Sequence, residues 1–330
     1  MEIEPLSATP NNQDPRSSIA DGHPVRDGSE RLGYNQAMKK QELLKLLGEF
    51  PGKAALEPVV LAEEDKGSYI ERKVEYSSED GERIPTYLLL PKLEGRLPAV
   101  FAHHQHAGNF ELGKSEVVGL AGDPDQCYAK ELAERGYVVI APDAIGFEER
   151  NDTSNTGGTA YREFTARLVQ GSSLNAKVVH DISAAIDYLS TLPEVDAGRI
   201  GFIGHSYGGQ MALWYPAFDN RIKATVSNCR CVSYAASLEK DIGIQMEFAI
   251  PGIASWGDIG DVVGLFDNCS TLISATTQDK YSFGAQALAD YIRASYPAQD
   301  VELKIYEGGH VFTPEMREHA YAWLESRLKD

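Results

Sequence analysis

A serine held between glycines, in "RIGFIGHSYGGQMALWY", is the clearest candidate for a chemical group in this 330-residue chain. Gly204 and Gly208 each stand two residues from Ser206, after an apolar run typical of a buried strand and before a run typical of a helix. Glycines there allow a sharp turn, because a side chain would meet neighbouring backbone. Such a turn presents the serine hydroxyl above the carboxyl end of a sheet, where it can act as a nucleophile.

A serine hydroxyl needs a base to take its proton and an acid to orient that base. His310 lies in "YEGGHVFTPE", between the last expected strand and the last expected helix, and Asp279 lies in "SATTQDKYSF", just past the preceding strand. The rival segment "IKATVSNCRCVSY" contains no carboxylate, so Asp279 is preferred. The other nearby acids are expected to cap helices or face solvent: Asp258, Asp261 and Asp267. The sequence therefore predicts a catalytic Ser206, Asp279 and His310, with the backbone N–H of Tyr207 facing a developing oxyanion.

The elements that must position these residues alternate between apolar strands and helices. Two strands, "YIERKVEYSS" and "RIPTYLLLPK", flank the turn "EDGE" and predict an antiparallel N-terminal pair. The later strands, "LPAVFAHH", "YVVIAPD", "RIGFIG", "IKATVSN", "TLISAT" and "VELKIYE", are separated by helices. This alternation predicts an α/β fold with a mostly parallel central sheet and helices on both faces. An apolar stripe marks the helix before the serine strand: Leu174, Val178, Ile182, Ala185, Ile186 and Leu189.

The chain divides into a tail and one domain. Residues 1–33 are rich in Pro, Asn, Asp, Ser and Gly and are expected to form a mobile N-terminal tail. Residues 34–330 are expected to form a single domain that starts with an amphipathic helix in "NQAMKKQELLKLLGEF". Residues 231–268 are long for a connection and predict a lid-like insertion. Its aromatic side chains either line a pocket or pack against the domain: Phe248, Trp256 and Phe266.

The serine turn, the acid and the histidine together resemble the α/β-hydrolase superfamily over about residues 70–330. Four stretches, "LPAVFAHHQHAGN", "GYVVIAPDAIGFEERN", "GHSYGG" and "GGHVF", resemble its dienelactone-hydrolase-like and acetyl-xylan-esterase-like branch. The resemblance implies the α/β-hydrolase fold and a second oxyanion donor in the loop after the third strand: the N–H of His106, with Gln105 as the alternative. Dienelactone hydrolases proper usually carry a cysteine nucleophile, so Ser206 favours ester chemistry over that lactone.

Composition limits the partners. There are 31 Lys and Arg against 49 Asp and Glu, a formal net charge of −18, and no basic stripe, so a nucleic-acid partner is not expected. The four cysteines form no CxxC pair, the N-terminus has no secretory pattern and no stretch has membrane-spanning length, so a cytoplasmic protein is expected. A homo-oligomer is left open.

Two polar motifs are expected to do no chemistry. His103, His104 and His106 invite a metal site, but neighbouring strand residues point to opposite faces and no carboxylate or cysteine completes the set. No metal or cofactor is therefore predicted. The stretch "FEERN" at residues 147–151 is expected to be a solvated loop.

The function that follows is cleavage of a carboxylic ester of a small molecule by a serine hydrolase, through an acyl-enzyme. The same residues would also serve an acyltransferase, a thioesterase, a lactonase or an amide or peptide hydrolase. A non-catalytic receptor on this fold is a further alternative, which the presence of all three triad residues disfavours.

Overall fold

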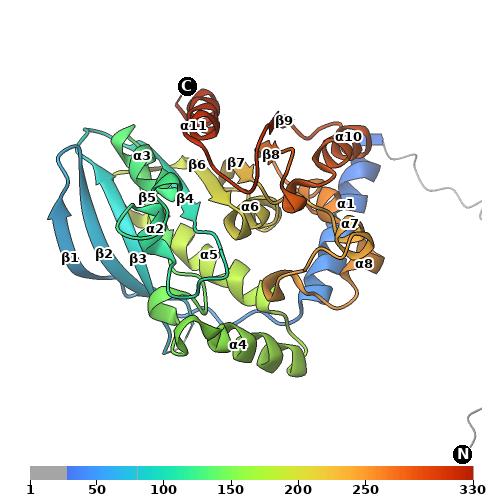
Figure 1. Cartoon of the computed structure of the whole chain (residues 1–330), viewed down its shortest axis with the longest axis horizontal. Coiled ribbons are helices and arrows are strands. Elements are labelled where there is room, and N and C mark those ends of the chain that lie inside the picture. The colour runs from blue at the N-terminus through green and yellow to red at the C-terminus, as the bar shows by residue number, and fades with distance from the viewer. Residues whose placement is uncertain (1–27, 80, 330) are drawn as a thin grey trace, which may run out of the picture.

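A nine-stranded mixed sheet forms the centre of the protein (Figure 1). The computed structural model describes residues 28–79 and 81–329, with side chains from residue 36. The strands are β1 (Val59–Asp65), β2 (Tyr69–Ser77), β3 (Arg83–Pro91), β4 (Leu97–His103), β5 (Val138–Pro142), β6 (Val195–His205), β7 (Ile222–Asn228), β8 (Ser270–Thr276) and β9 (Val301–Tyr306). Their order is β1-β2-β3-β5-β4-β6-β7-β8-β9. The pairs from β1 to β5 are antiparallel and those from β5 to β9 are parallel. The sequence predicts the antiparallel β2–β3 pair and the mostly parallel sheet, but not the antiparallel pairs β1–β2 and β3–β5.

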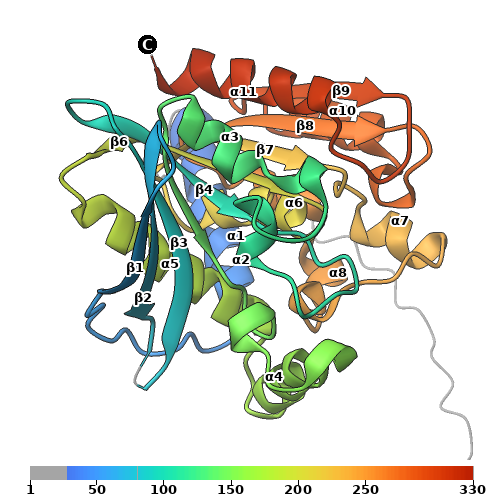
Figure 2. The ribbon, with the colours of Figure 1, turned by 60° about the vertical axis from the view of Figure 1, so that its left-hand side comes forward.

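Helices cover both faces of the sheet (Figure 2). They are α1 (Gly28–Leu47), α2 (Lys114–Val117), α3 (Tyr128–Glu134), α4 (Gly158–Val169), α5 (Leu174–Thr191), α6 (Tyr207–Ala212), α7 (Tyr234–Glu239), α8 (Ile253–Trp256), α9 (Ile259–Val263), α10 (Ala285–Ser295) and α11 (Pro314–Leu328). Side chains alternate along β4: Phe101 joins the core under α1, α5 and α10, and Val100 joins the core under α3 and α11. All six residues of the predicted α5 stripe are buried. None of the described helices is long and apolar enough to cross a membrane.

The N-terminal boundary differs from the prediction. Residues 1–27 of the predicted tail lie outside the described range, and α1 begins at Gly28, within the segment assigned to the tail. The elements that the sequence does not predict include β1, α2 and α4. Every residue of β1 is exposed, so the strand has no buried face to produce an alternating pattern.

The segment 231–268 folds into short helices that pack on the body of the protein. These include α7, α8, α9 and a 3₁₀ turn at Met246–Phe248. Phe248 and Phe266 belong to the main core, and Trp256 Nε1 donates to the Lys39 carbonyl of α1 at 3.0 Å. The expected capping role of Asp258 and Asp261 is confirmed, because their side chains form a capping box at the start of α9. The aromatic residues of this segment thus pack into the body of the protein.

A buried network of charges ties α5 to the β2–β3 turn and to the "FEERN" stretch. Lys177 Nζ of α5 lies 2.8 Å from Asp181 Oδ1 and 2.5 Å from Glu79 Oε1, and it also contacts Glu82. Arg150 bonds Asp181 Oδ2 at 2.8 Å and Glu82 as well, and its side chain is only 4% exposed. The expectation of a solvated loop at 147–151 is therefore wrong: its charges are compensated by residues distant in the sequence.

Replacing Lys177 with Met should lower the free energy of unfolding by about 3–5 kcal/mol, because Arg150 is then, among the described residues, the one buried cation left to compensate Asp181 and Glu82. Urea denaturation measures the loss. Lys53→Met is the matched control, since Lys53 is 71% exposed in its pair with Asp187 and should contribute less than about 1 kcal/mol. Equal losses in the two variants would contradict this interpretation.

Candidate active site

Ser206 occupies a strained turn between β6 and α6. Its φ and ψ are 55° and −114°, a positive φ that a residue with a side chain rarely adopts. The Ser206 N–H donates to the Asn228 carbonyl at 2.9 Å, and the Ser206 carbonyl accepts from the Gln210 N–H at 2.9 Å. Because these bonds fix both sides of the residue, the strand end of β7 and the first turn of α6 hold the strained conformation in place.

The two flanking glycines have no room for a side chain. A Cβ atom on Gly204 would lie 2.3 Å from the Gly208 backbone, and one on Gly208 would lie 2.2 Å from the His103 carbonyl oxygen. In the register of the sheet, His103 of β4 pairs with Gly204 of β6. The start of α6 therefore packs directly on the end of β4, which is the steric requirement that the sequence pattern suggested.

Gly208→Ala should lower the free energy of unfolding by roughly 3 kcal/mol or more, or prevent soluble folding, because backbone atoms of β4 cannot yield as a flexible side chain would. Gly243→Ala is the control, since a Cβ there meets nothing within 4 Å. Soluble yield and thermal denaturation of both variants measure the difference. A Gly208→Ala protein as stable as the control would contradict the close approach.

Asp279 and His310 lie in contact at the carboxyl edge of the sheet. Asp279 follows β8 and His310 lies between β9 and α11, and His310 Nδ1 is 3.1 Å from Asp279 Oδ1. Asp279 is buried, and it also accepts from the Tyr281 N–H at 3.0 Å and from the Ser282 hydroxyl at 2.8 Å. Burial acts to raise the pKa of Asp279, but the bond and charge of His310 and the other donors hold it below its ordinary value. The carboxylate is therefore kept ionised and aimed at the His310 ring.

His205 connects this pair to the serine turn. Its ring centroid lies 4.6 Å from that of His310, and Ser206 is the next residue. Asn228 Nδ2 lies 2.6 Å from His205 Nδ1 and donates to the Val311 carbonyl at 3.0 Å. Across residues 28–79 and 81–329, no hydrogen bond joins the Ser206 hydroxyl to the His310 ring. The structure thus brings Asp279 and His310 together and places them beside the residue that precedes Ser206.

The loop after β4 has a defined arrangement of histidines. The Ala144 N–H donates to His104 Nε2 at 3.1 Å, so Nδ1 carries the proton and donates to the Gln105 carbonyl at 2.7 Å. Burial lowers the pKa of His104 to about 4, which keeps the ring neutral. In a trans peptide the N–H points opposite to the carbonyl, so the His106 N–H points away from the carbonyl that His104 holds. His104 therefore orients the peptide between Gln105 and His106.

The three histidine rings considered for a metal are engaged by backbone groups. His103 Nδ1 lies 2.9 Å from the His104 carbonyl, and His106 Nδ1 accepts from the Gly108 N–H at 3.0 Å. Burial, and then the charge of Arg230, lowers the pKa of His106 to about 4. Asn228 and Arg230 contribute to this region without being predicted from the sequence, and His104 is considered there for a metal site. The position of Asn228 at a strand end is a signal that could have drawn attention to it.

A buried lysine fixes the far end of the same loop. Lys114 Nζ lies 2.7 Å from Asp143 Oδ2, 2.6 Å from Glu148 Oε1 and 2.5 Å from Glu149 Oε1. These three carboxylates come close enough together to suggest a cation site, but the lysine ammonium already lies among them. Since Asp143 directly follows β5 and precedes Ala144, this cluster and His104 anchor the loop to the sheet at two points.

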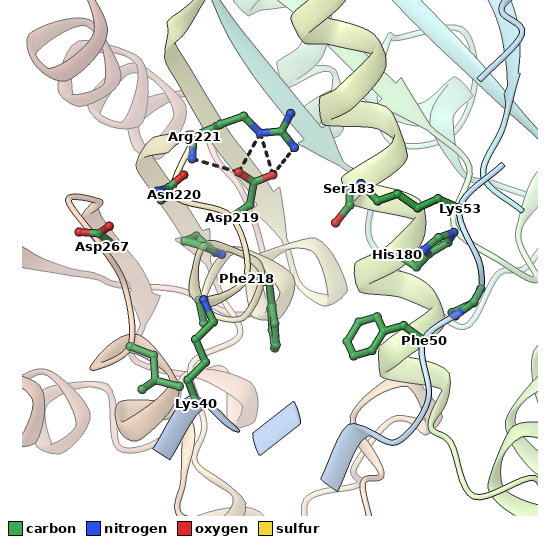
Figure 3. Close-up of a pocket in the computed structure, with 14 residues that line it drawn as sticks. Lys40, Phe50, Lys53, His180, Ser183, Phe218, Asp219, Asn220, Arg221 and Asp267 are labelled. Carbon is green, nitrogen blue, oxygen red and sulfur yellow. Dashed lines mark hydrogen bonds and ion pairs between the residues drawn. The ribbon is translucent and has the colours of Figure 1, made fainter. Parts of the chain in front are cut away.

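A cavity of about 520 Å³ lies elsewhere (Figure 3). It is lined by His180 and Ser183 of α5 and by residues 219–221 before β7. Arg221 Nη2 lies 2.6 Å from Asp219 Oδ2, so the guanidinium of this lining residue is already paired with a carboxylate. Arg221 precedes the first residue of β7, whereas Ser206 bonds its last residue. The cavity therefore lies at the opposite end of the strands from the predicted catalytic residues.

The fold, with a strained serine turn at the carboxyl edge of a mostly parallel sheet, defines the class of α/β hydrolases. Residues 114–326, more than half of the chain, match the model of the dienelactone hydrolase family. The chain belongs to this family. The assignment confirms the resemblance found in the sequence motifs.

Individual proteins are similar to this chain in sequence or in fold. The chain is 33% identical over 202 residues to "Putative hydrolase YtaP" of Bacillus subtilis (strain 168), a match that covers 60% of this chain and 66% of that protein. Among solved structures, a glucuronoyl esterase from Solibacter usitatus superposes with a TM-score of 0.69 at 15% identity, covering 94% of this chain and 96% of that one. An acetyl xylan esterase from Paenibacillus sp. R4 superposes with a TM-score of 0.60 at 19% identity, covering 93% and 97%. These two structures support the fold.

Proposed function

We propose that the protein is a serine esterase that cleaves carboxylic esters of small molecules with Ser206, His310 and Asp279. The contact of 3.1 Å between His310 Nδ1 and the buried carboxylate of Asp279, beside the strained serine turn, carries the proposal. It leaves His310 Nε2 as the nitrogen that can accept a proton. Family membership and the names of the relatives support hydrolysis of an ester.

The reaction has two halves. Ser206 Oγ attacks the ester carbonyl while His310 accepts its proton, and Asp279 stabilises the imidazolium that forms. His310 then gives this proton to the leaving alcohol, which departs from the tetrahedral intermediate and leaves an acyl group on Ser206. Water, deprotonated by His310, attacks the acyl-enzyme, and His310 returns that proton to Ser206 Oγ as the bond between Ser206 and the acyl group breaks and the carboxylic acid is released.

The developing negative charge on the carbonyl oxygen is received by two backbone N–H groups. The N–H of Tyr207 lies in the first turn of α6, where a helix N-terminus favours an anion. The second donor is the His106 N–H, with Gln105 as the alternative. The orientation of the peptide after Gln105, fixed by His104, favours His106.

An ester panel tests the proposal. The panel contains acetyl, butyryl and octanoyl esters, the matching thioesters and short peptide amides. The protein should hydrolyse the esters faster than the thioesters or the amides. Ser206→Ala should abolish ester hydrolysis, and Asp279→Asn should lower kcat by about 10³–10⁴-fold, because the histidine loses the group that sets its tautomer. Asp267→Asn, an exposed acid, should leave the rate unchanged and serves as the control. Turnover that survives Ser206→Ala would contradict the proposal, and faster cleavage of thioesters or amides would replace the ester assignment.

His104→Asn and His104→Ala test the orientation of the oxyanion donor. Asparagine can still donate from near the Nδ1 position, whereas alanine cannot, so kcat on the best ester should fall about tenfold or more in His104→Ala and be partly restored in His104→Asn. KM should change little, since the interaction is made mainly in the transition state. His319→Asn is the control. A loss that falls equally on both His104 variants, or falls on KM alone, would argue against this role.

A further inference from the structure

Arg230 is a buried cation in the middle of the candidate site. It lies two residues past the end of β7 and is 3% exposed, as little as Ser206 at 4%. Its Nε donates to Gln210 Oε1 at 2.8 Å, and its guanidinium carbon lies 4.3 Å from the centre of the Tyr281 ring. Both partners are uncharged. Among the described residues no carboxylate oxygen lies within 4.0 Å of this guanidinium, so the positive charge has no ionic partner in contact.

The two acids whose charges act on Arg230, Asp279 and Glu247, do not supply a contacting partner. Both carboxylate oxygens of Asp279 are bonded to other groups, namely His310, Tyr281 and Ser282. Glu247 is fully buried and neither of its carboxylate oxygens meets a hydrogen-bond donor of the described chain, and burial raises its pKa to about 7 although the charge of Arg230 acts to lower it. Placing a guanidinium where water is largely excluded, with no contacting anion, is costly unless a ligand completes the pair.

The residues around Arg230 are neighbours of the proposed catalytic groups. Tyr281, which its guanidinium covers, lies 5.1 Å from the His310 ring between centroids. Gln210, which it bonds, donates its N–H to the Ser206 carbonyl. The charge of Arg230 also acts on the His106 ring, in the loop that would supply the second oxyanion donor. Arg230 thus faces parts of all three segments that would surround a bound ester.

We propose that Arg230 binds a carboxylate of the substrate, so that the preferred substrates are esters that carry a free carboxylate in their acid or alcohol part. This inference rests on the proposed serine esterase function. A guanidinium matches the two oxygens of a carboxylate with parallel donors. The chain carries a net charge of −18, which repels anions at long range, and a fixed local cation offsets that repulsion within the site.

Matched ester pairs test the inference. 4-Acetoxybenzoate and 4-acetoxybenzamide differ by a carboxylate in the alcohol part, and monomethyl succinate and methyl succinamate differ by one in the acid part. In at least one pair the wild-type protein should prefer the carboxylate by about tenfold or more in kcat/KM. Arg230→Gln should lose about 30-fold or more on the anionic member, chiefly through KM, and less than about threefold on the amide, with partial recovery in Arg230→Lys.

Arg162→Gln is the matched control, because this arginine is exposed and pairs with Asp152. This substitution should leave kcat/KM unchanged for both members of each ester pair. The inference is overturned if wild-type protein treats the members of both pairs alike, or if Arg230→Gln loses activity equally on anionic and neutral esters. Cleavage of the neutral esters that depends on Ser206 but shows no such preference would overturn the role of Arg230 and leave the esterase proposal intact.

Binding to the inactive protein separates the inference from catalysis. In the Ser206→Ala background, calorimetry should show the carboxylate member binding at least about tenfold more tightly than the amide, and Arg230→Gln should remove that difference. If Arg230→Gln fails to fold, Arg230→Lys serves in its place, with a weaker preference expected. Equal binding of the carboxylate and the amide would overturn the inference, whereas preferential binding without any ester hydrolysis would count against the proposed esterase alone.

Discussion

The close approach of three backbones around Ser206 is the constraint on which the site depends. The first turn of α6 touches the end of β4 through Gly208, and the Ser206 N–H is bonded to the end of β7. These contacts require residues without a side chain on both sides of Ser206, and they hold Ser206 at a positive φ. As a result, a change in the position of β4 or β7 moves the serine, and the loop after β4 starts directly beside it.

The same strand ends hold the other groups in register. Asn228 ends β7 and bonds the carbonyl of Val311, next to His310, while Thr276 at the end of β8 donates to the Gly309 carbonyl at 2.7 Å. The N–H of Cys231 bonds the Tyr281 carbonyl at 3.0 Å. Parallel strands therefore do more than support the loops of the site: their last residues bond those loops to one another, which limits how far Asp279 and His310 can separate.

The sequence predicted those parts of the fold that depend on local pattern. The strands β4 to β8 are buried on both faces and so appear as apolar runs, and α5 shows its buried stripe at helical spacing. The exposed strand β1 gave no such signal. The charged residues of "FEERN" predict a solvated loop from the sequence alone, because their partners, Lys114 and Asp181 among them, are distant in the chain and come into contact only in the fold. Polar burial depends on such distant partners, which a local pattern does not contain.

For the candidate site the same limit applies. Ser206 lies in a local motif, and the positions of Asp279 and His310 followed from the order of the strands, so all three could be proposed. His104 and Arg230 could not, because their roles depend on bonds to Ala144, Gln105 and Gln210 that no spacing reveals. The catalytic assignment of the three residues stays a prediction, although the contact between Asp279 and His310 is explicit.

If His310 removes the proton of Ser206 during catalysis, the rate at which a fluorophosphonate modifies the protein must depend on His310. Peptide mass spectrometry identifies the modified residue, and the rate is compared among the wild type, His310→Gln and His319→Gln. We expect modification of Ser206, slowed by about 100-fold or more in His310→Gln and unchanged in His319→Gln, since an unassisted hydroxyl is a weak nucleophile. Modification of another residue, or an equal rate in His310→Gln, would contradict it.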